Sequence, residues 1–149
     1  MFKVFNFRNF DPGARHAVVT IGNFDGVHIG HRALIGRVVE EARVLQAAGV
    51  LLTFQPHPQS VLRSDPLPVI SSLPLRLRLF ERLGLDMACI IPFTAAFAAK
   101  SAQQFVDEYL FGQFQVKKLI IGYDFGFGRN REGSAEVLLQ LSRQHGFMF

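Results

Sequence analysis

The sequence predicts an α/β fold in which helices cover both faces of a parallel sheet. Short apolar runs alternate along the chain with longer amphipathic segments, and this alternation is typical of parallel sheets. The chain has 149 residues, of which 49% are hydrophobic and 19% charged, and this composition is that of a globular protein. That length is enough for one domain with a substantial core.

Four apolar runs are the predicted strands. They read HAVVTIG, VLLTF, DMACIIPF and KKLIIG, and they cover residues 16–22, 50–54, 86–93 and 117–122. Nearly continuous apolar runs indicate strands that are buried on both faces of a sheet. The last residues, FMF at 147–149, look like the opening of a further strand that the chain does not complete.

The segments between these strands are predicted helices, over residues 31–49, 73–84, 101–114 and 134–146. In the first of them, apolar side chains recur at helical spacing, at Leu34, Val38, Ala42 and Leu45. Gly49 is its predicted end. Pro74 suits the first turn of the second helix, and Ser101 and Ser134 are the predicted N-caps of the last two.

Composition argues against several classes of function. The chain has a single cysteine, Cys89, so it can form no internal disulfide. One cysteine also argues against a cysteine-based zinc site, which needs several thiolate ligands. The N-terminal stretch MFKVFNFRNF contains too many polar residues for a signal peptide, and no apolar run reaches the length of about 18 residues that a membrane span needs. We therefore expect a cytoplasmic protein without a membrane partner.

The charge distribution points to small anionic ligands rather than to nucleic acid. The formal net charge is +4, and the basic residues are scattered instead of forming a run. Nucleic-acid binding normally needs a basic patch or stripe, so no nucleic-acid partner is expected. A modest positive field suits nucleotides and similar small molecules.

Four loops are predicted to meet at one edge of the sheet, because ligands of such folds bind outside the carboxyl ends of the strands. They read GNFDGVHIGH, QPHPQS, PFTAAF and GYDFGFGRNREG, and they cover residues 22–31, 55–60, 92–97 and 122–133. The first, second and fourth are the richest in Gly, Pro, His and charged residues. These three loops are the predicted walls of one site.

The loop after the first strand places His28 and His31 at the start of a predicted helix. Free N–H groups and the positive end of the helix dipole favour phosphate there, and Gly30 leaves space for an anion to approach the backbone. Both imidazoles can face the same anion. Two other interpretations remain: a zinc pair completed by His57 or Asp25, or histidines that simply satisfy the loop and the helix cap.

At this point the sequence resembles a known family. HIGH at 28–31 is similar to the H-x-G-H signature of the nucleotidyltransferase superfamily, which class I aminoacyl-tRNA synthetases also carry. GNFDGVHIGH, LTFQPHP and GYDFGFGRNREG occur in the order typical of the adenylyltransferase (FAD synthetase) module of bacterial bifunctional riboflavin kinase/FMN adenylyltransferases. That family carries G-x-F-D-G-V-H-x-G-H, F-x-P-H-P and G-x-[DN]-F-x-F-G-x-x-R-x-G. The chain lacks the K-M-S-K-S type loop of the synthetases.

The resemblance covers nearly the whole chain and implies a fold and an activity. The implied fold is a Rossmann-like, doubly wound parallel sheet of the nucleotidyltransferase type, in a single domain over 1–149 with its last strand incomplete. The implied reaction transfers AMP from ATP to FMN and gives FAD and pyrophosphate, with Mg²⁺ bridging the phosphates. His28 and His31 are the implied catalytic residues, which hold the ATP phosphates and stabilise the charge of the transition state. The implied ATP-binding residues are Gly22, Asn23, Phe24, Asp25 and Gly30.

The resemblance also implies a flavin-binding side, made of the second and fourth loops. Its residues are Phe54, Pro56, His57, Pro58, Asp124, Phe125, Phe127 and Arg131. Simpler interpretations exist for some of them: His57 as a solvated turn residue, Phe125 and Phe127 as core residues, and Arg131 as a surface residue.

Two features of the family pattern do not occur in this chain. Family members carry a later I-S-S-T-x-x-R stretch that also contacts the ATP phosphates, and a riboflavin kinase domain usually follows. The chain therefore resembles a C-terminally truncated module that is fused to a riboflavin kinase domain in the full-length protein. Two alternatives to an FMN adenylyltransferase stay open: a module that binds flavin or ATP without chemistry, and a nucleotidyltransferase of the same superfamily with another acceptor.

Overall fold

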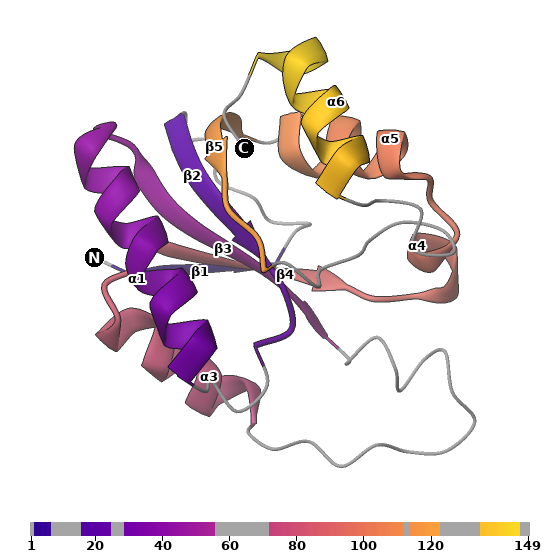
Figure 1. Ribbon diagram of the computed structural model, residues 1–149. Helices are drawn as coiled ribbons and strands as arrows, with labels where there is room; N and C mark the ends of the chain where they lie inside the picture. Colours follow the sequence, from indigo (N-terminus) through magenta and orange to yellow (C-terminus); the bar gives the residue numbers. More distant parts are fainter. Residues whose placement is uncertain are drawn as a thin grey trace.

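The protein folds around a five-stranded sheet in the order β1-β4-β3-β2-β5, whose neighbouring strands run parallel (Figure 1). The computed structural model describes residues 2–6, 16–24, 29–55, 72–111, 114–122 and 135–146. The strands are β1 (Lys3–Asn6), β2 (His16–Ile21), β3 (Ala48–Gln55), β4 (Met87–Pro92) and β5 (Gln115–Leu119). The predicted α/β class is confirmed.

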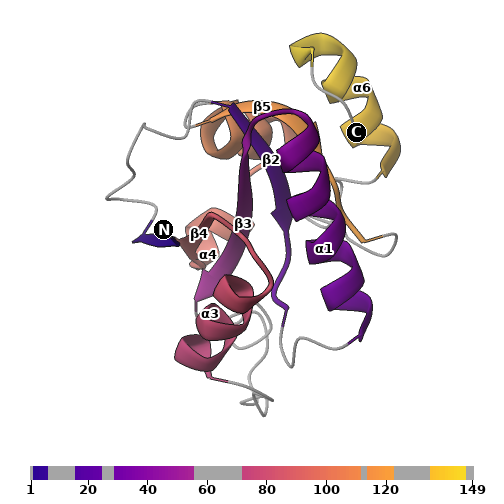
Figure 2. The ribbon, with the colours of Figure 1, turned by 90° about the vertical axis from the view of Figure 1, so that its left-hand side faces the viewer.

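Helices cover both faces of the sheet, as predicted for a doubly wound fold. Figure 2 looks onto the face that carries α1 (Ile29–Val44) and α3 (Leu73–Arg82). The opposite face carries α4 (Ala95–Ala98), α5 (Ala102–Phe105), the π-helical turn η2 (Val106–Phe111) and α6 (Ala135–His145) (Figure 1).

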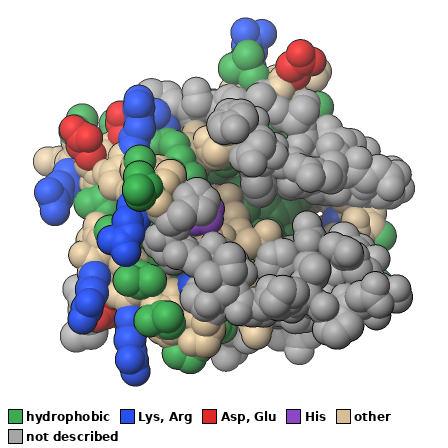
Figure 3. Space-filling view, turned by 60° about the horizontal axis from the view of Figure 1, so that its bottom comes forward, with side chains coloured by type: hydrophobic (Ala, Val, Ile, Leu, Met, Phe, Trp, Pro, Cys, Tyr) green, Lys and Arg blue, Asp and Glu red, His purple; other side chains and the backbone are tan. Residues whose placement is uncertain are grey.

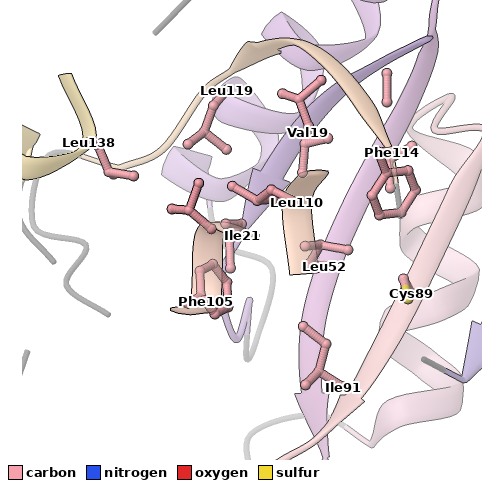
Figure 4. Packing of buried hydrophobic residues seen from close by; sticks show 14 of the residues in the cluster. Val19, Ile21, Leu52, Cys89, Ile91, Phe105, Leu110, Phe114, Leu119 and Leu138 are labelled. Carbon is pink, nitrogen blue, oxygen red and sulfur yellow. The ribbon is translucent and has the colours of Figure 1, made fainter. Parts of the chain in front are cut away.

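Two apolar cores lie on the two faces of the sheet, because alternate side chains of each strand point to opposite faces. Thus Val19 and Ile21 of β2 pack in one core and Val18 packs in the other. The larger core lies under α5, η2 and α6 (Figure 4) and includes Phe105, Leu110, Phe114, Leu119 and Leu138. The core under α1 and α3 includes Ile35, Val38, Leu51 and Phe80.

The end of the first helix differs from the prediction. We expected the helix to run to Gly49, but α1 ends at Val44. Gln46 adopts a left-handed backbone, with φ 52°, and the amide of Ala47 donates to the carbonyl of Ala42 at 2.9 Å. This is the Schellman arrangement that glycine usually provides, here with glutamine in the left-handed position. The glycine signal therefore pointed three residues too late along the chain.

Gly49 does not end a helix but takes part in a hydrogen-bond link, through Asp86, to the strand β1, which the sequence analysis did not predict. Gly49 lies in β3, and its amide donates to a carboxylate oxygen of Asp86 at 2.8 Å. The carbonyl of Asp86 in turn accepts from the amide of Lys3, at the start of β1, at 3.0 Å. Edge strands such as β1 are short and partly exposed, and Val4 is 45% exposed. Such a strand contains no apolar run long enough to be recognised in the sequence, and β1 was therefore not predicted.

The remaining helices follow their predicted starts. Ser72 caps α3 by accepting from the amide of Leu75 at 3.3 Å, and Pro74 lies in the first turn. Ser101 caps α5 in a reciprocal capping box with Gln104. The segment predicted as one helix over 101–114 is α-helical only to Phe105 and then continues as η2.

Other differences concern short or terminal elements. The loop PFTAAF contains the four-residue helix α4, which Thr94 caps, and the sequence did not predict it. The predicted closing glycine of the last helix is confirmed, since Gly146 follows α6 with φ 75°. The predicted cap Ser134 and the predicted last strand at 147–149 lie outside the described residues. No helix in the described ranges is long and apolar enough to cross a membrane.

The thiol of Cys89 is expected to be inert in the folded protein. Its side chain is fully buried in β4, and this burial raises the pKa of the thiol to about 12. Because the thiolate is the reactive form, iodoacetamide at pH 8 should modify the native chain at least about 100-fold more slowly than the chain in urea. Equal rates, followed by mass spectrometry, would contradict this burial.

Candidate active site

The strand order places a topological switch point between β2 and β5. From β2 the chain proceeds outward through β3 to β4 on one side, whereas β5 returns to the other side of β2. Ligands of open parallel sheets bind where the strand order reverses, outside the carboxyl ends. The loops that follow β2 and β5 are the predicted GNFDGVHIGH and GYDFGFGRNREG loops. The topology thus places the carboxyl ends of β2 and β5, which are about 100 residues apart in the chain, side by side, whereas most of the GYDFGFGRNREG segment lies outside the described residues.

Figure 3 brings forward the side of the molecule on which α1 begins. Lys and Arg side chains gather along one part of this face, and a histidine is visible near its centre. The first turn of α1 contains no acidic residue, so no carboxylate of its own offsets the positive end of the helix dipole. The electrostatics of this end of α1 favour an anion.

The chain makes a tightly held turn directly after β2. The amide of Gly22 donates to the carbonyl of Leu52 at 3.1 Å, which extends the pairing between β2 and β3. The carbonyl of Asn23 then accepts two hydrogen bonds, from Arg76 Nη1 at 2.6 Å and from Thr53 Oγ1 at 3.3 Å. Elements β3 and α3 therefore fix the direction of the chain as it leaves the sheet.

Phe24 follows in the left-handed region, with φ 54°, which is uncommon for a residue other than glycine. Its ring is only 4% exposed and packs edge-on against Phe80 and against His31, at centroid distances of 5.9 and 5.2 Å. We expected Phe24 to shape the nucleotide pocket. The structure places its ring in the core under α1 and α3, where the ring is in edge-on contact with the imidazole of His31.

His31 lies in the first turn of α1, two residues after the helix begins at Ile29. Ile29 is 86% exposed and Gly30 is exposed, whereas His31 is half-buried and its Nδ1 is inaccessible to solvent. His31 is thus the residue of this turn whose side chain packs against the rest of the protein rather than facing solvent. His31 and Gly30 both lie in the first turn of α1, and their predicted contact with a phosphate stays a prediction.

Several polar residues in and near the turn are buried or half-buried, namely Thr20, Asn23, His31, Thr53 and Arg76. Thr20 and Thr53 are fully buried, and Arg76 is 5% exposed. Within the described part of the chain, Thr20 Oγ1 and Asn23 Oδ1 are buried and have no hydrogen-bond partner. Buried polar atoms are normally paired, so these two oxygens mark a place where a ligand or water would complete the hydrogen bonding.

Arg76 was not predicted as a site residue, although the sequence carries a signal for it. It precedes the core residue Phe80 by four positions and therefore lies on the same face of α3. This spacing places Arg76 on the helix face that packs on the core, and its side chain is indeed buried there. The exposed Arg78 and Arg82 of the same helix lack this spacing.

Phe54, the described member of the predicted flavin side, is the penultimate residue of β3 and lies in an aromatic cluster. Its ring is 6% exposed and lies 5.7 Å from the rings of Phe93 and Phe97. Phe97 of α4 extends the cluster to Tyr109, at 5.0 Å. The pKa of Tyr109 is raised, chiefly because burial disfavours the phenolate. The sequence analysis did not place Phe93, Phe97 and Tyr109 beside Phe54. The two phenylalanines of the loop PFTAAF were the only sequence signal for this cluster.

The other predicted site residues lie outside the described residues. They are Asp25, His28, Pro56, His57, Pro58, Asp124, Phe125, Phe127 and Arg131. The zinc interpretation of the two histidines also depends on this set, since it needs His57 or Asp25. The ranges that the structure describes contain no group of three His, Cys, Asp or Glu side chains that could hold a metal ion.

Replacing Gly22 with alanine is expected to destabilise the protein by about 1–3 kcal/mol. A Cβ at this position would lie 3.0 Å from the ring of Phe24, which Phe80 and His31 hold in place. The matched control is Gly36→Ala in α1, where nothing lies within 4 Å and alanine should stabilise the helix. Urea unfolding measures both changes, and equal effects would contradict the close packing at Gly22.

Comparison with known proteins decides the family. The sequence model of FAD synthetase matches residues 11–149. The chain belongs to the FAD synthetase family. It is 38% identical to the bifunctional riboflavin kinase/FMN adenylyltransferase of Escherichia coli strain K12, over 87% of this chain and 42% of that protein. It is 33% identical to the protein of the same name from Bacillus subtilis strain 168, over 82% of this chain and 39% of that one.

This member of the FAD synthetase family therefore spans less than half the length of these two relatives. A solved structure shares its fold: the crystal structure titled as a macrolide-efflux protein from Streptococcus pneumoniae superposes with a TM-score of 0.84. That structure is 26% identical, and the match covers 94% of this chain and 55% of the other. The predicted family resemblance is confirmed.

Proposed function

We propose that this chain transfers AMP from ATP to FMN and thereby produces FAD and pyrophosphate. Family membership supports this reaction, and two of the relatives are named for it. The structural observation that carries the proposal is His31: a half-buried imidazole on the first turn of α1, at the switch point of the sheet.

The chemistry needs charge neutralisation and alignment more than covalent catalysis. An oxygen of the FMN phosphate attacks the α-phosphorus of ATP, and the bond from that phosphorus to the departing pyrophosphate breaks. Negative charge spreads over the phosphoryl oxygens as this happens. His31, and His28 three residues before it, would donate hydrogen bonds to those oxygens, and the amides of the first turn of α1 would add to them.

The ATP side of the proposed site combines backbone and side-chain groups. Gly30 is exposed and leaves the start of α1 open to a phosphate, while Gly22 and Asn23 form the turn that leads to it. Asn23 Oδ1 is a buried acceptor that a hydroxyl or amino group of the nucleotide would satisfy. Phe24 contributes through its support of His31, and Asp25 belongs to the same proposed pocket. Mg²⁺ would arrive with ATP, held by phosphate oxygens and water.

The flavin side would be built on the aromatic cluster at the ends of β3 and β4. Phe54 supports this proposal because it lies at the carboxyl end of β3, two residues before the first proline of the predicted flavin loop. Aromatic and apolar walls suit a flat ring system such as isoalloxazine. We propose Pro56, His57 and Pro58 as the next part of this wall. Asp124, Phe125, Phe127 and Arg131 would line the opposite side.

We further propose that the chain works as part of a larger protein with a riboflavin kinase domain, because both named relatives are bifunctional and more than twice the matched length. Such a domain would produce the FMN that this module consumes.

Chromatographic detection of FAD tests the proposed reaction. The chain, alone and extended by the continuation of its own reading frame, is incubated with ATP, Mg²⁺ and FMN, and FAD and pyrophosphate are measured. FAD in either sample supports the proposal. Binding of ATP and FMN without pyrophosphate release would favour a binding-only module, and pyrophosphate release with another acceptor in place of FMN would favour a different nucleotidyltransferase.

A further inference from the structure

We propose that Arg76 is a positioning residue for the nucleotide: it fixes the turn after β2 and, through that turn, the place of His31. The proposal rests on the proposed function for its kinetic readout, and it also has a readout that does not depend on activity. Arg76 itself lies on α3 and follows Asn23 by 53 residues, so the link is purely tertiary.

The first step concerns the burial of Arg76. A guanidinium carries a permanent charge, and burying it is costly unless hydrogen bonds compensate. Arg76 is nevertheless only 5% exposed, whereas Arg78 and Arg82 on the same helix lie at the surface. Its Nη1 donates to the carbonyl of Asn23 at 2.6 Å. Such charge-assisted hydrogen bonds are short and strong, which matches this distance.

The second step concerns what the bond restrains. Phe24, the residue after Asn23, has φ 54°, a conformation that costs free energy for a phenylalanine. Such a residue keeps its conformation only where its surroundings hold it. The hydrogen bonds to the Asn23 carbonyl hold it from one side, and the packing of its ring against Phe80 holds it from the other.

The third step connects the turn to the proposed chemistry. The Phe24 ring lies 5.2 Å from the ring of His31 and packs against it edge-on. If the turn relaxes, the ring moves, and the imidazole loses the surface on which it rests. Arg76 thus acts on His31 through Asn23 and Phe24, without a contact to the substrate. A small displacement of a group that binds phosphate weakens its hydrogen bonds steeply, because these depend on distance and angle.

The test compares Arg76→Met with Arg78→Met, which removes an exposed arginine from the same helix. We expect Arg76→Met to raise the KM for ATP by about 10- to 100-fold, the range that corresponds to losing a charged hydrogen bond. The KM for FMN should change much less. Arg76→Lys keeps a cationic donor of shorter reach and should restore part of the ATP affinity. Arg78→Met should behave like the unaltered chain.

Amide hydrogen exchange over residues 22–24 and 29–31 provides the readout that needs no activity. We expect faster exchange there in Arg76→Met than in Arg78→Met. Equal exchange and an equal KM for ATP in the two variants would overturn the proposal. If neither the unaltered chain nor its extended form makes FAD, the proposed function fails, and the exchange comparison still decides the role of Arg76.

A second variant applies if Arg76→Met does not fold. Thr53→Val removes the other donor to the Asn23 carbonyl and preserves the shape of the side chain. We expect the same changes at a smaller size, about 2- to 10-fold in the KM for ATP, because this hydrogen bond is longer and its donor is neutral. A Thr53→Val chain that matches the unaltered one in both exchange and KM would then overturn the proposal.

Discussion

Replacement of His31 by alanine is expected to lower the rate of FAD formation by about 100- to 1000-fold. The imidazole would donate to phosphoryl oxygens whose charge grows in the transition state, and deleting one such donor typically has an effect of this size. The loss should appear both in kcat and in the KM for ATP, because the imidazole would bind the phosphates of ATP already in the ground state and more strongly in the transition state. The fold should survive, because His31 is only half-buried.

The matched control for His31→Ala is His16→Ala. His16 is the first residue of β2, at the end of that strand away from the turn that leads to His31, and it is exposed. We expect its removal to leave FAD formation within about twofold of the unaltered chain, as is usual for a surface substitution. If His31→Ala keeps nearly full activity, the imidazole does not act on the phosphates. If the purified chain binds one zinc ion and His31→Ala loses it, the metal interpretation takes over.

The buried central part of the fold was predictable because its physical signals are strong. Strands β2 and β3 are buried on both faces, so they appear in the sequence as continuous apolar runs. The apolar face of α1 was predicted correctly: Val38 and Ala42 are buried, and Leu34 and Leu45 pack against the same core. Burial of a whole element leaves a pattern that repeats along the sequence.

Features set by hydrogen-bond geometry or by exposure were not predictable in the same way. Helix α1 ends where Gln46 takes a left-handed backbone, which glutamine rarely does, so the sequence signal at Gly49 was misleading. The edge strand β1 buries too little to show a continuous apolar run. The change from α5 to η2 occurs within an unbroken amphipathic segment, where periodicity alone does not separate α-helical from π-helical turns.

The site shows the same division. His31 and Gly30 were predicted from a short motif whose residue types suit an anion site; the structure places both in the first turn of α1, and their role toward phosphate stays a prediction. The burial of Phe24 was not predicted, because the residue type does not tell whether an aromatic ring faces a ligand or the core, whereas Phe54 belongs to the run 50–54 that was predicted as a buried strand. Arg76 reaches Asn23 only when the chain folds, so a contact of this kind has no local signature.

The largest loss of stability in this region is expected from Phe24→Ala, at about 3–5 kcal/mol. The ring is 4% exposed and lies between Phe80 and His31, so its removal leaves a cavity in the core beneath α1 and α3. Alanine also retains the penalty of the left-handed backbone, because it has a Cβ. Urea unfolding at a fixed temperature measures the change.

Phe114→Ala is the control that separates the contribution of Phe24 to stability from its contribution to ATP binding. Phe114 is 3% exposed and packs in the core on the opposite face of the sheet. Its loss should reduce the free energy of unfolding by a comparable amount and leave ATP affinity per folded molecule unchanged. Phe24→Ala should reduce both, because the ring also supports His31. If calorimetry under conditions where both variants are folded gives them equal ATP affinity, Phe24 is a core residue alone, and the support of His31 must come from elsewhere.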